Sequence, residues 1–518
     1  MRLIGFSIIL LFLAQCCYSA RILGVFPMAG KSLNILYNRL AKGLADAAHD
    51  VTLISAYEHK LPIKNGSITD VLLTGFAEDY ENMLKGLLDT PEEYEVTAIL
   101  HYLEMFNPLW NSTFHHPNVR KLLDSNQKFD LVITEHLWND CLKIFAHIYN
   151  SPLVVFTSMG GINPWINDQV GNFLLPSYVP HFYKLGDFSK GLNFVHRVHN
   201  LLYSLTDYVY KHYYLFPTQN ALLKGAFSNP PDLEDIYDDV ALVLLGSHAS
   251  LRSPTPLSPN TVEIGGFHID PPKKLPKDLQ DIMDNAKNGV IFFSMGSHVQ
   301  SKDFSAEKMK IFLNVFAKLK QTVLWKFEDE TLPGKPDNVH IRKWMPQMDL
   351  LAHPNMKLFI THGGYGSLQE TIYHGVPVLA ISVFADQHNN AFQAVQLGYA
   401  LKLSYNDKNF SEETLFNLIQ ELLSNPKYRE NAQARSRVYH DRPMKPLDTA
   451  IYWIEYVIRN KGAEHLRLPS TKLPWYKLYL IDVFAVFFIS LLVLYKIVCV
   501  LLSKVFRGKQ QKRKLKKK

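Results

Sequence analysis

The stretch from Arg21 to Ser55 reads RILGVF-PMAG-KSLNILYNRLAKGLADAAH-DVTLIS. Its two outer runs, RILGVF and DVTLIS, are short and apolar, as is typical of strands. The segment between them places leucines at the helical spacing of three or four residues: Leu33, Leu36, Leu40 and Leu44. A strand, a helix and a strand joined by short turns form a βαβ unit, so this stretch predicts a parallel sheet covered by helices.

The same alternation continues along the chain and then begins again. FDLVIT (129–134) and PLVVFT (152–157) are further strand-like runs. A stretch rich in Pro and Lys follows at 270–277, and strand-like runs return at 289–294, 322–326 and 358–361. We therefore expect an α/β fold of two doubly wound, Rossmann-like domains, 21–270 and 285–466, joined by a linker at 271–284. Such domains bind ligands at the carboxyl ends of their strands, which predicts a site in a cleft where the two domains face each other.

Both ends of the chain carry apolar segments of different length. The first, within residues 1–20, follows Arg2 and ends in small residues, which favours a secretory signal peptide over a membrane anchor. The second, 480–502, is long enough to span a bilayer. Aromatic residues lie in the preceding juxtamembrane segment, 467–479, and a basic tail follows at 503–518. This order predicts a single-pass type I protein with a lumenal body and a cytosolic tail.

The basic tail accounts for the sign of the net charge. The chain carries +7 overall, whereas the tail alone holds nine Lys and Arg, so the rest is slightly acidic. This argues against a nucleic-acid partner. The terminal sequence KLKKK resembles a lysine-based retrieval signal of the endoplasmic reticulum, although it also fits a topology signal alone. Possible glycosylation sites at Asn65, Asn111 and Asn409 fit a lumenal body, and the sequence shows no zinc-like cluster of ligands.

The most specific motif lies between residues 344 and 387. It comprises Trp344-Met-Pro-Gln347, Thr361-His362-Gly363-Gly364, Gln369-Glu370 and Asp386-Gln387. The two glycines follow a strand-like run and open a helix. Backbone N–H groups can therefore approach a diphosphate there, and the helix N-terminus favours its negative charge.

This block resembles the UDP-glycosyltransferase family, and the chain looks like an insect-type, invertebrate member. The likeness extends to Phe293-Ser294-Met-Gly296-Ser297 and to Asp441-Arg-Pro. It implies the two-domain GT-B fold and a UDP-sugar as the bound co-substrate. It also implies that Trp344 stacks on uracil, that Gln347 and Glu370 bind the base or ribose, and that Asp386 and Gln387 bind the sugar. The phosphates would be held by Ser294, Ser297, His362, Gly363, Gly364 and the backbone of Ser367. The family often has Asn where this chain has Gly366, which removes one side-chain donor.

The acceptor half departs from the family pattern. The family has a catalytic His directly after a Ser that follows the first strand, whereas this chain has Ser32-Leu33. The acid that supports that His is replaced by Glu135, with Asp140 close by, so either carboxylate is a candidate catalytic residue. His136 is an alternative base, although it would point away from Glu135 if both were in one strand.

Two functions remain open at this point. The first is an inverting transferase that moves a hexose from a UDP-sugar to a small lipophilic acceptor, with glucose favoured and glucuronic acid as the alternative. Because general-base catalysis contributes about 10²–10⁴-fold, amines and acidic phenols would suffer least from its loss. Aromatic residues of the first half fit a lipophilic pocket: Phe106, Trp110, Phe156, Trp165, Phe173, Phe182 and Tyr183. The second function is a catalytically impaired relative that binds a UDP-sugar or a partner; the sequence leaves homo- and hetero-oligomers open.

Overall fold

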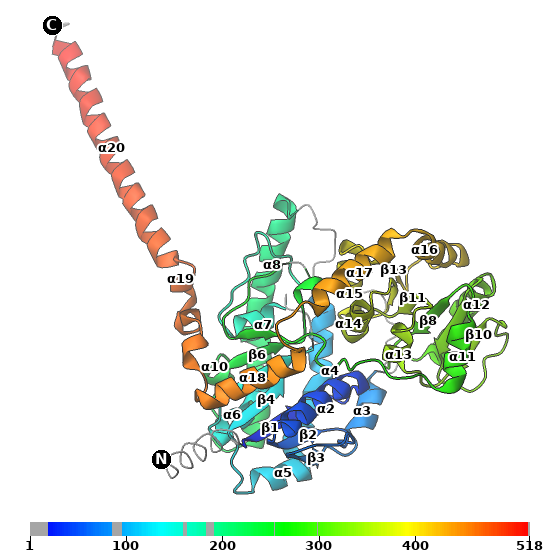
Figure 1. Ribbon diagram of the computed structural model, residues 1–518. Helices are drawn as coiled ribbons and strands as arrows, with labels where there is room; N and C mark the ends of the chain where they lie inside the picture. Colours follow the sequence, from blue (N-terminus) through cyan, green and yellow to red (C-terminus); the bar gives the residue numbers. More distant parts are fainter. Residues whose placement is uncertain are drawn as a thin grey trace, which may run out of the picture. The chain divides into compact units, whose positions relative to one another are not determined.

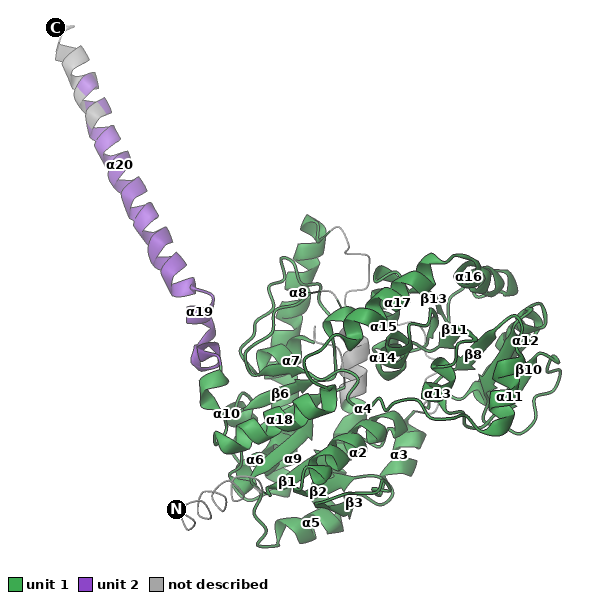
Figure 2. Cartoon of the chain, in the orientation of Figure 1, with its two compact units in different colours: residues 1–467 green, residues 468–518 purple. Residues whose placement is uncertain are grey.

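The computed structural model describes residues 19–84, 96–158, 163–182, 191–252, 254–297 and 299–515. Almost all of the predicted signal peptide lies outside these residues. The chain forms two compact units, unit 1 (residues 1–467) and unit 2 (residues 468–518), which Figure 2 shows in different colours.

The first sheet of unit 1 contains the βαβ unit that opens the chain. Its seven strands are all parallel and lie in the order β3-β2-β1-β4-β5-β6-β7. Their bounds are β1 Arg21–Phe26, β2 Asp50–Ser55, β3 Ser67–Leu72, β4 Leu131–Glu135, β5 Leu153–Thr157, β6 Leu242–Leu245 and β7 Thr261–Glu263. β1 pairs with β2 from Arg21 opposite Asp50 onward, and helix α2 (Lys31–Asp46) connects them, as predicted.

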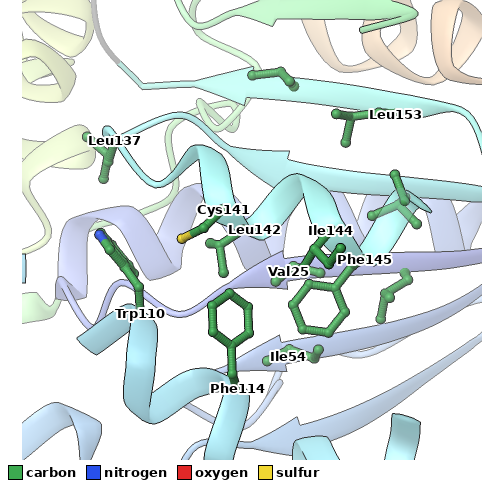
Figure 3. Close-up of a cluster of buried hydrophobic side chains, with 14 of the residues drawn as sticks. Val25, Ile54, Trp110, Phe114, Leu137, Cys141, Leu142, Ile144, Phe145 and Leu153 are labelled. Atoms are coloured by element: carbon green, nitrogen blue, oxygen red, sulfur yellow. The ribbon is translucent and has the colours of Figure 1, made fainter. Parts of the chain in front are cut away.

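Helices cover both faces of this sheet (Figure 1). Besides α2, the helical segments of this half of the chain are α3 Phe76–Met83, α4 Val96–His115, α5 Pro117–Leu123, η2 Asp140–Lys143, α6 Ile144–Tyr149, α7 Pro164–Asp168, α8 Phe194–Tyr210, η3 Lys211–Leu215, α9 Phe216–Ala226, α10 Leu233–Ile236 and η4 Ala249–Leu251. Because successive side chains of a strand point to opposite faces, β1 contributes to two cores. Leu23 and Val25 pack with Trp110 and Phe114 on one face, shown in Figure 3, while Ile22 and Phe26 pack on the other.

The second sheet is also entirely parallel, with the order β10-β9-β8-β11-β12-β13. Its strands are β8 Val290–Ser294, β9 Thr322–Lys326, β10 Val339–Arg342, β11 Met356–Thr361, β12 Val378–Ser382 and β13 Ala400–Ser404. Its helices are α11 Lys277–Asn285, η5 Ser301–Asp303, α12 Ala306–Ala317, α13 Gln347–Leu351, α14 Tyr365–His374, α15 Gln387–Gln396, α16 Glu412–Ser424 and α17 Lys427–His440. The predicted α/β class with two doubly wound sheets is confirmed.

Two helices differ from the domain bounds expected from the sequence. Helix α11 begins at Lys277, inside the predicted linker 271–284, because Leu279 and Met283 lie four residues apart and are buried in a core of the second sheet. Helix α18 (Pro446–Arg459), expected within the second domain, packs instead against the first sheet. Its apolar face, which includes Ala450 and Ile454, is buried with residues of β1 and α2. We propose domain bounds that move α18 to the first domain.

Unit 2 contains the predicted membrane segment. A short turn η7 (Pro469–Lys472) and helix α19 (Trp475–Leu478) precede the long helix α20 (Ile481–Leu515). Within α20, Ile481–Lys504 is long and apolar enough to cross a membrane, with a mean hydropathy of 2.7. This agrees closely with the predicted span at 480–502.

Candidate functional site

The first part of the candidate site lies where β8 and β11 end side by side. Ser294, the last residue of β8, is opposite Thr361, the last residue of β11. The two loops that follow therefore meet. Gly296 has φ +79°, and a Cβ there would lie 2.5 Å from Cε1 of His362. The absence of a side chain at Gly296 is what allows the imidazole of His362 to lie against this loop.

The loop after β11 leads directly into helix α14. Gly363 adopts φ +83°, a conformation that glycine reaches without the steric cost other residues have. Gly364 caps the helix, and no side chain accepts a hydrogen bond from its first turn. The first N–H groups of a helix have no partner within it, and together with the helix dipole they attract anions. The N-terminus of α14 is thus chemically suited to a phosphate group.

A second group of predicted residues meets on one side of α14. The Nε2 of Gln347 donates to Oγ of Ser367 at 3.1 Å and to Oε2 of Glu370 at 2.5 Å. Nε2 of His268 lies 3.7 Å from the other Glu370 oxygen. Trp344 is 65% exposed, so its ring face is available to a ligand. The Ser297 hydroxyl, in contrast, is buried without a hydrogen-bond partner.

The third group lies at the start of α15 and is tied to the glycine loop. Asp386 accepts a hydrogen bond of 2.7 Å from Nδ2 of Asn390, which also donates to the backbone oxygen of Gly363 at 3.1 Å. Burial raises the pKa of Asp386. Asn390 links the two loops and was missed from the sequence, although its position four residues after Asp386 on a helix was a usable signal.

Gln387 and Ala385 fix the shape of this loop. Oε1 of Gln387 accepts from the backbone N–H groups of Val383, at 2.9 Å, and Phe384, at 3.2 Å. Ala385 has φ +55°, which is uncommon for a residue with a Cβ. Strained backbone of this kind concentrates at functional sites.

Helix α14 also contacts the carboxyl end of β6 in the first sheet. The Tyr365 hydroxyl donates to Oγ of Ser247 at 2.7 Å, and Nε2 of Gln369 donates to the Gly246 oxygen at 3.0 Å. The helix that carries the anion-binding end is therefore held by hydrogen bonds from both sheets.

At the expected base position, Leu33 has a structural role. It lies in the first turn of α2 and packs against the cores on both faces of the first sheet. A leucine side chain cannot accept a proton, so the residue at this position cannot act as a general base.

Glu135 ends β4, on the strand next to β1. Its side chain is 2% exposed, and Oε1 accepts a hydrogen bond of 2.8 Å from Oγ of Ser158. Burial raises the pKa of Glu135 to about 8, against the lowering effect of Ser158. Burial thus favours the protonated form of this carboxyl at neutral pH, which makes it a weaker candidate base.

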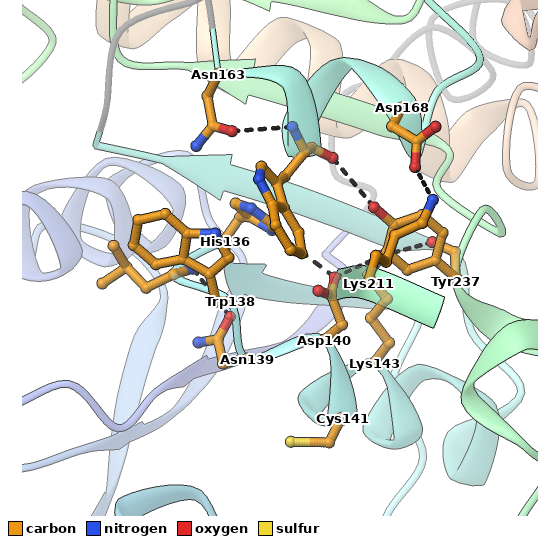
Figure 4. A network of polar contacts seen from close by, with 12 residues as sticks. His136, Trp138, Asn139, Asp140, Cys141, Lys143, Asn163, Asp168, Lys211 and Tyr237 are labelled. Carbon is orange, nitrogen blue, oxygen red and sulfur yellow. Dashed lines mark hydrogen bonds and ion pairs between the residues drawn. The ribbon is translucent and has the colours of Figure 1, made fainter. Parts of the chain in front are cut away.

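Asp140 lies in a buried polar network that Figure 4 shows. Its carboxylate is 3.0 Å from Nζ of Lys143 and 3.7 Å from Nδ1 of His136. Burial alone would raise the pKa of Asp140, but the charge of the Lys143 ammonium, with the His136 ring beside it, holds that pKa well below its usual range. Nζ of Lys143 also donates to the backbone oxygen of Tyr237 at 2.5 Å and lies over the Tyr237 ring. Asp140 is therefore ionised and paired with Lys143, although among the described residues neither of its two buried oxygens has a hydrogen-bond partner.

His136 is one of several residues of this loop that have a buried polar atom without a hydrogen-bond partner. It is 2% exposed, and its Nε2 is buried with no hydrogen-bond partner, while Nδ1 faces Asp140. Trp138, two residues on, has φ +55°, a costly conformation for a bulky side chain. The structure thus brings together His136 and Asp140, but within the described part of the chain we find no hydrogen bond or ion pair that joins them to Gln347, Ser367 or Glu370.

The aromatic residues expected to line a lipophilic pocket have mixed positions. Trp110, Phe156 and Trp165 are at most 3% exposed and belong to buried clusters, so they serve as core residues. Tyr183 lies outside the described residues. Within the described part of the chain there is no group of three or more metal-ligating residues.

Comparison with known proteins identifies the family. The model of the UDP-glucuronosyl and UDP-glucosyl transferases matches residues 47–517. The chain belongs to the UDP-glycosyltransferase family. A UDP-glycosyltransferase (UGT5) of Dactylopius coccus is 37% identical over 92% of this chain and 90% of its own length. UDP-glucosyltransferase 2 of the same insect is 35% identical over 96% of both chains.

This UDP-glycosyltransferase chain has mammalian relatives as well. UDP-glucuronosyltransferase 2B17 of Rattus norvegicus is 32% identical over 92% of both chains. Among solved structures, the glycosyltransferase of kitacinnamycin matches with a TM-score of 0.58 at 17% identity, over 85% of this chain and all of its own. The calicheamicin glycosyltransferase CalG4 matches with a TM-score of 0.56. These matches confirm the GT-B fold, and the apolar helix at 481–504 fits a membrane-anchored transferase.

Proposed function

We propose that the chain moves a hexose from a UDP-sugar to a small lipophilic acceptor, with inversion at the anomeric carbon. The observation that supports this best is the uncapped N-terminus of α14 beside His362 and the Gly296 loop. Charge develops on the diphosphate as the C1–O bond to UDP breaks, and preorganised N–H donors stabilise that charge. UDP leaves as the acceptor oxygen or nitrogen bonds to C1 from the opposite side.

The other donor residues would have the roles that the family resemblance implies. Trp344 would stack on uracil with its exposed ring, while Gln347 and Glu370 would exchange their mutual hydrogen bond for bonds to the base and ribose. Asp386 and Gln387 would bind the sugar hydroxyls. Remaining phosphate contacts would come from Ser294, Ser297, Gly363, Gly364 and Ser367. Glucose is favoured over glucuronic acid because a full-length insect relative is named a UDP-glucosyltransferase.

We also propose that the protein resides in the endoplasmic reticulum membrane with its body in the lumen. The possible span Ile481–Lys504, with the basic tail after it, supports this orientation. Asn65, Asn111 and Asn409 are exposed, as glycosylation there would require.

The proposal is tested by measuring UDP release from full-length protein in microsomes, with UDP-glucose or UDP-glucuronate and with phenol or amine acceptors. Gly296→Ala is expected to lower kcat/KM about 10²-fold, because its Cβ would displace His362 from the phosphates. The matched control is Gly225→Ala on α9, which meets nothing within 4 Å and should leave kcat/KM unchanged. Equal activity of the two variants would show that His362 is not part of the donor site. No UDP release by the wild type with any pair of substrates would refute the function.

For acceptor activation, we propose that His136 replaces the missing base. A histidine whose Nδ1 faces a carboxylate and whose Nε2 is free is the usual arrangement of a general base. The acceptor hydroxyl would lie beside Nε2 of His136, which has no hydrogen-bond partner in the part of the chain that the structure describes, and would transfer its proton to that atom. Asp140 would orient the ring and stabilise its positive charge, and Glu135 would stay protonated.

Replacing His136 by glutamine is expected to lower kcat about 10²-fold with an alcohol acceptor and by less than about 10-fold with an amine, which needs little deprotonation. Donor KM should not change. Equal losses with both acceptors, or an altered melting temperature that accounts for them, would make His136 a structural residue only.

A second candidate function, a catalytically impaired UDP-sugar-binding relative, is favoured by Leu33. If the wild type binds UDP-glucose but releases UDP with neither acceptor class, and Leu33→His gains activity, this second function is the correct one. Transfer by the wild type excludes it.

A further inference from the structure

Helix α8 has its polar face turned toward the protein. Asn200, in the middle of the helix, is fully buried, and its Nδ2 donates to the backbone oxygens of Pro176 and Val179. Its Oδ1 accepts from the N–H of His181 at 3.2 Å. Two turns later, Asp207 pairs with Nε2 of His181 at 2.8 Å. Polar side chains therefore hold α8 in place, which is the reverse of an ordinary surface helix.

The opposite face of α8 is apolar and exposed. Six of its residues are each at least 39% exposed and recur at helical spacing: Phe194, Val198, Leu201, Leu202, Leu205 and Val209. At 100° per residue they form one continuous stripe, centred opposite Asn200. One end of α8 extends past the neighbouring elements (Figure 1). A contiguous apolar surface of this kind marks a place of interaction with another apolar body.

The ends of this stripe are aromatic, and one flank carries an arginine. Phe194 is 71% exposed at the start, and Tyr213, just after the helix, is 77% exposed. Arg197 lies on one flank, and Asp207, the acidic residue of α8, is paired with His181. Aromatic rings prefer the interface between water and hydrocarbon, and cations are attracted to lipid phosphates.

We propose that the exposed stripe of α8 inserts into the interfacial layer of the bilayer in which the chain is anchored. Three observations favour lipid over a second copy of the chain: the aromatic ends, the basic flank and the apolar helix at 481–504 of the same chain. The connecting segment 468–480 extends to at most about 45 Å, so the membrane is always within reach of unit 1. Unit 1 would thus have a membrane contact separate from its anchor.

The proposal is tested with full-length protein in vesicles of phosphatidylcholine and phosphatidylserine. Leu202→Cys, in a Cys499→Ser background, is labelled with an environment-sensitive fluorophore; Cys141 is fully buried. The matched control is Glu413→Cys, an exposed position on α16. Lipids that carry a spin label in the acyl chain are expected to quench the label at residue 202 several-fold more than the label at residue 413.

A double variant checks that the stripe itself causes the quenching. Leu201→Glu with Leu205→Glu, added to the labelled Leu202→Cys chain, is expected to reduce quenching to the control value, since both positions are exposed and their replacement leaves the cores intact. Equal quenching at residues 202 and 413 would overturn the proposal. So would weak quenching together with disulfide-linked dimers of unlabelled Leu202→Cys on oxidation, because that result assigns the stripe to a second copy.

Discussion

Replacing Lys143 by methionine is expected to destabilise unit 1 by about 3–5 kcal/mol, the usual cost of removing one partner of a buried ion pair. Lys143 is 3% exposed and Asp140 is 1% exposed, and their charged atoms lie 3.0 Å apart. Without Lys143, the Asp140 carboxylate keeps only His136 at 3.7 Å, and the Tyr237 oxygen loses its donor. Methionine fills a similar volume, so the effect reports the charge and not a cavity. Urea denaturation of detergent-solubilised protein measures it.

Two further variants control this experiment. Lys143→Met combined with Asp140→Asn removes both charges and should recover most of the lost stability. Lys318→Met removes a pair with Glu412 whose side chains are 55% and 36% exposed, and it should change the free energy of unfolding by less than about 1 kcal/mol. A Lys143 variant as stable as the Lys318 variant would mean that water reaches Asp140 and that the network of Figure 4 is not closed.

The sequence predicted the features of the fold that depend on local patterns. The apolar runs and helical leucine spacing between residues 21 and 55 predicted the βαβ unit, which β1, α2 and β2 confirm. The glycines of the 361–364 loop likewise indicated a strand-to-helix turn, which β11 and α14 confirm. In each case the information lies within a few residues of the element that it specifies.

Features that depend on distant contacts could not be predicted in this way. The apolar face of α18 fits any core, and only the fold shows that it packs on the first sheet. Lys143 looks like a surface residue until Asp140 and Tyr237 are placed around it. The same holds for Asn390, whose bond to Gly363 joins residues 27 positions apart. At α8, sequence periodicity gives an amphipathic helix but not which face is buried, and here the polar face is inside.

The stability of the protein is expected to fall as the pH rises from about 5 to 8, with Glu135 contributing up to about 4 kcal/mol to the fall. In the folded chain burial raises the pKa of Glu135 from its ordinary value of 4.5 to about 8. Below pH 4.5 both states are protonated, and the contribution is fully present. Between pH 4.5 and 8 the unfolded chain releases a proton that the folded chain keeps, so stability is lost through this window. Within this window, each pH unit lowers the free energy of unfolding by about 1.4 kcal/mol.

Glu135→Gln isolates this contribution, because glutamine keeps the shape of the protonated carboxyl and can still accept from Ser158. The variant should match the wild type near pH 4.5 and be more stable at pH 8, whereas Glu413→Gln, at an exposed position, should follow the wild type throughout. If the free energies of unfolding of Glu135→Gln and wild type change in the same way with pH, the raised pKa of Glu135 is contradicted.

The same variant decides between the two candidate bases, Glu135 and His136. If Glu135 took the acceptor proton, wild-type kcat would rise toward pH 8 and the glutamine variant would lose that rise. If His136 is the base, with Asp140 behind it, kcat of the variant should stay within about 3-fold of wild type at every pH below 8, because a protonated glutamic acid and glutamine present the same uncharged surface to His136.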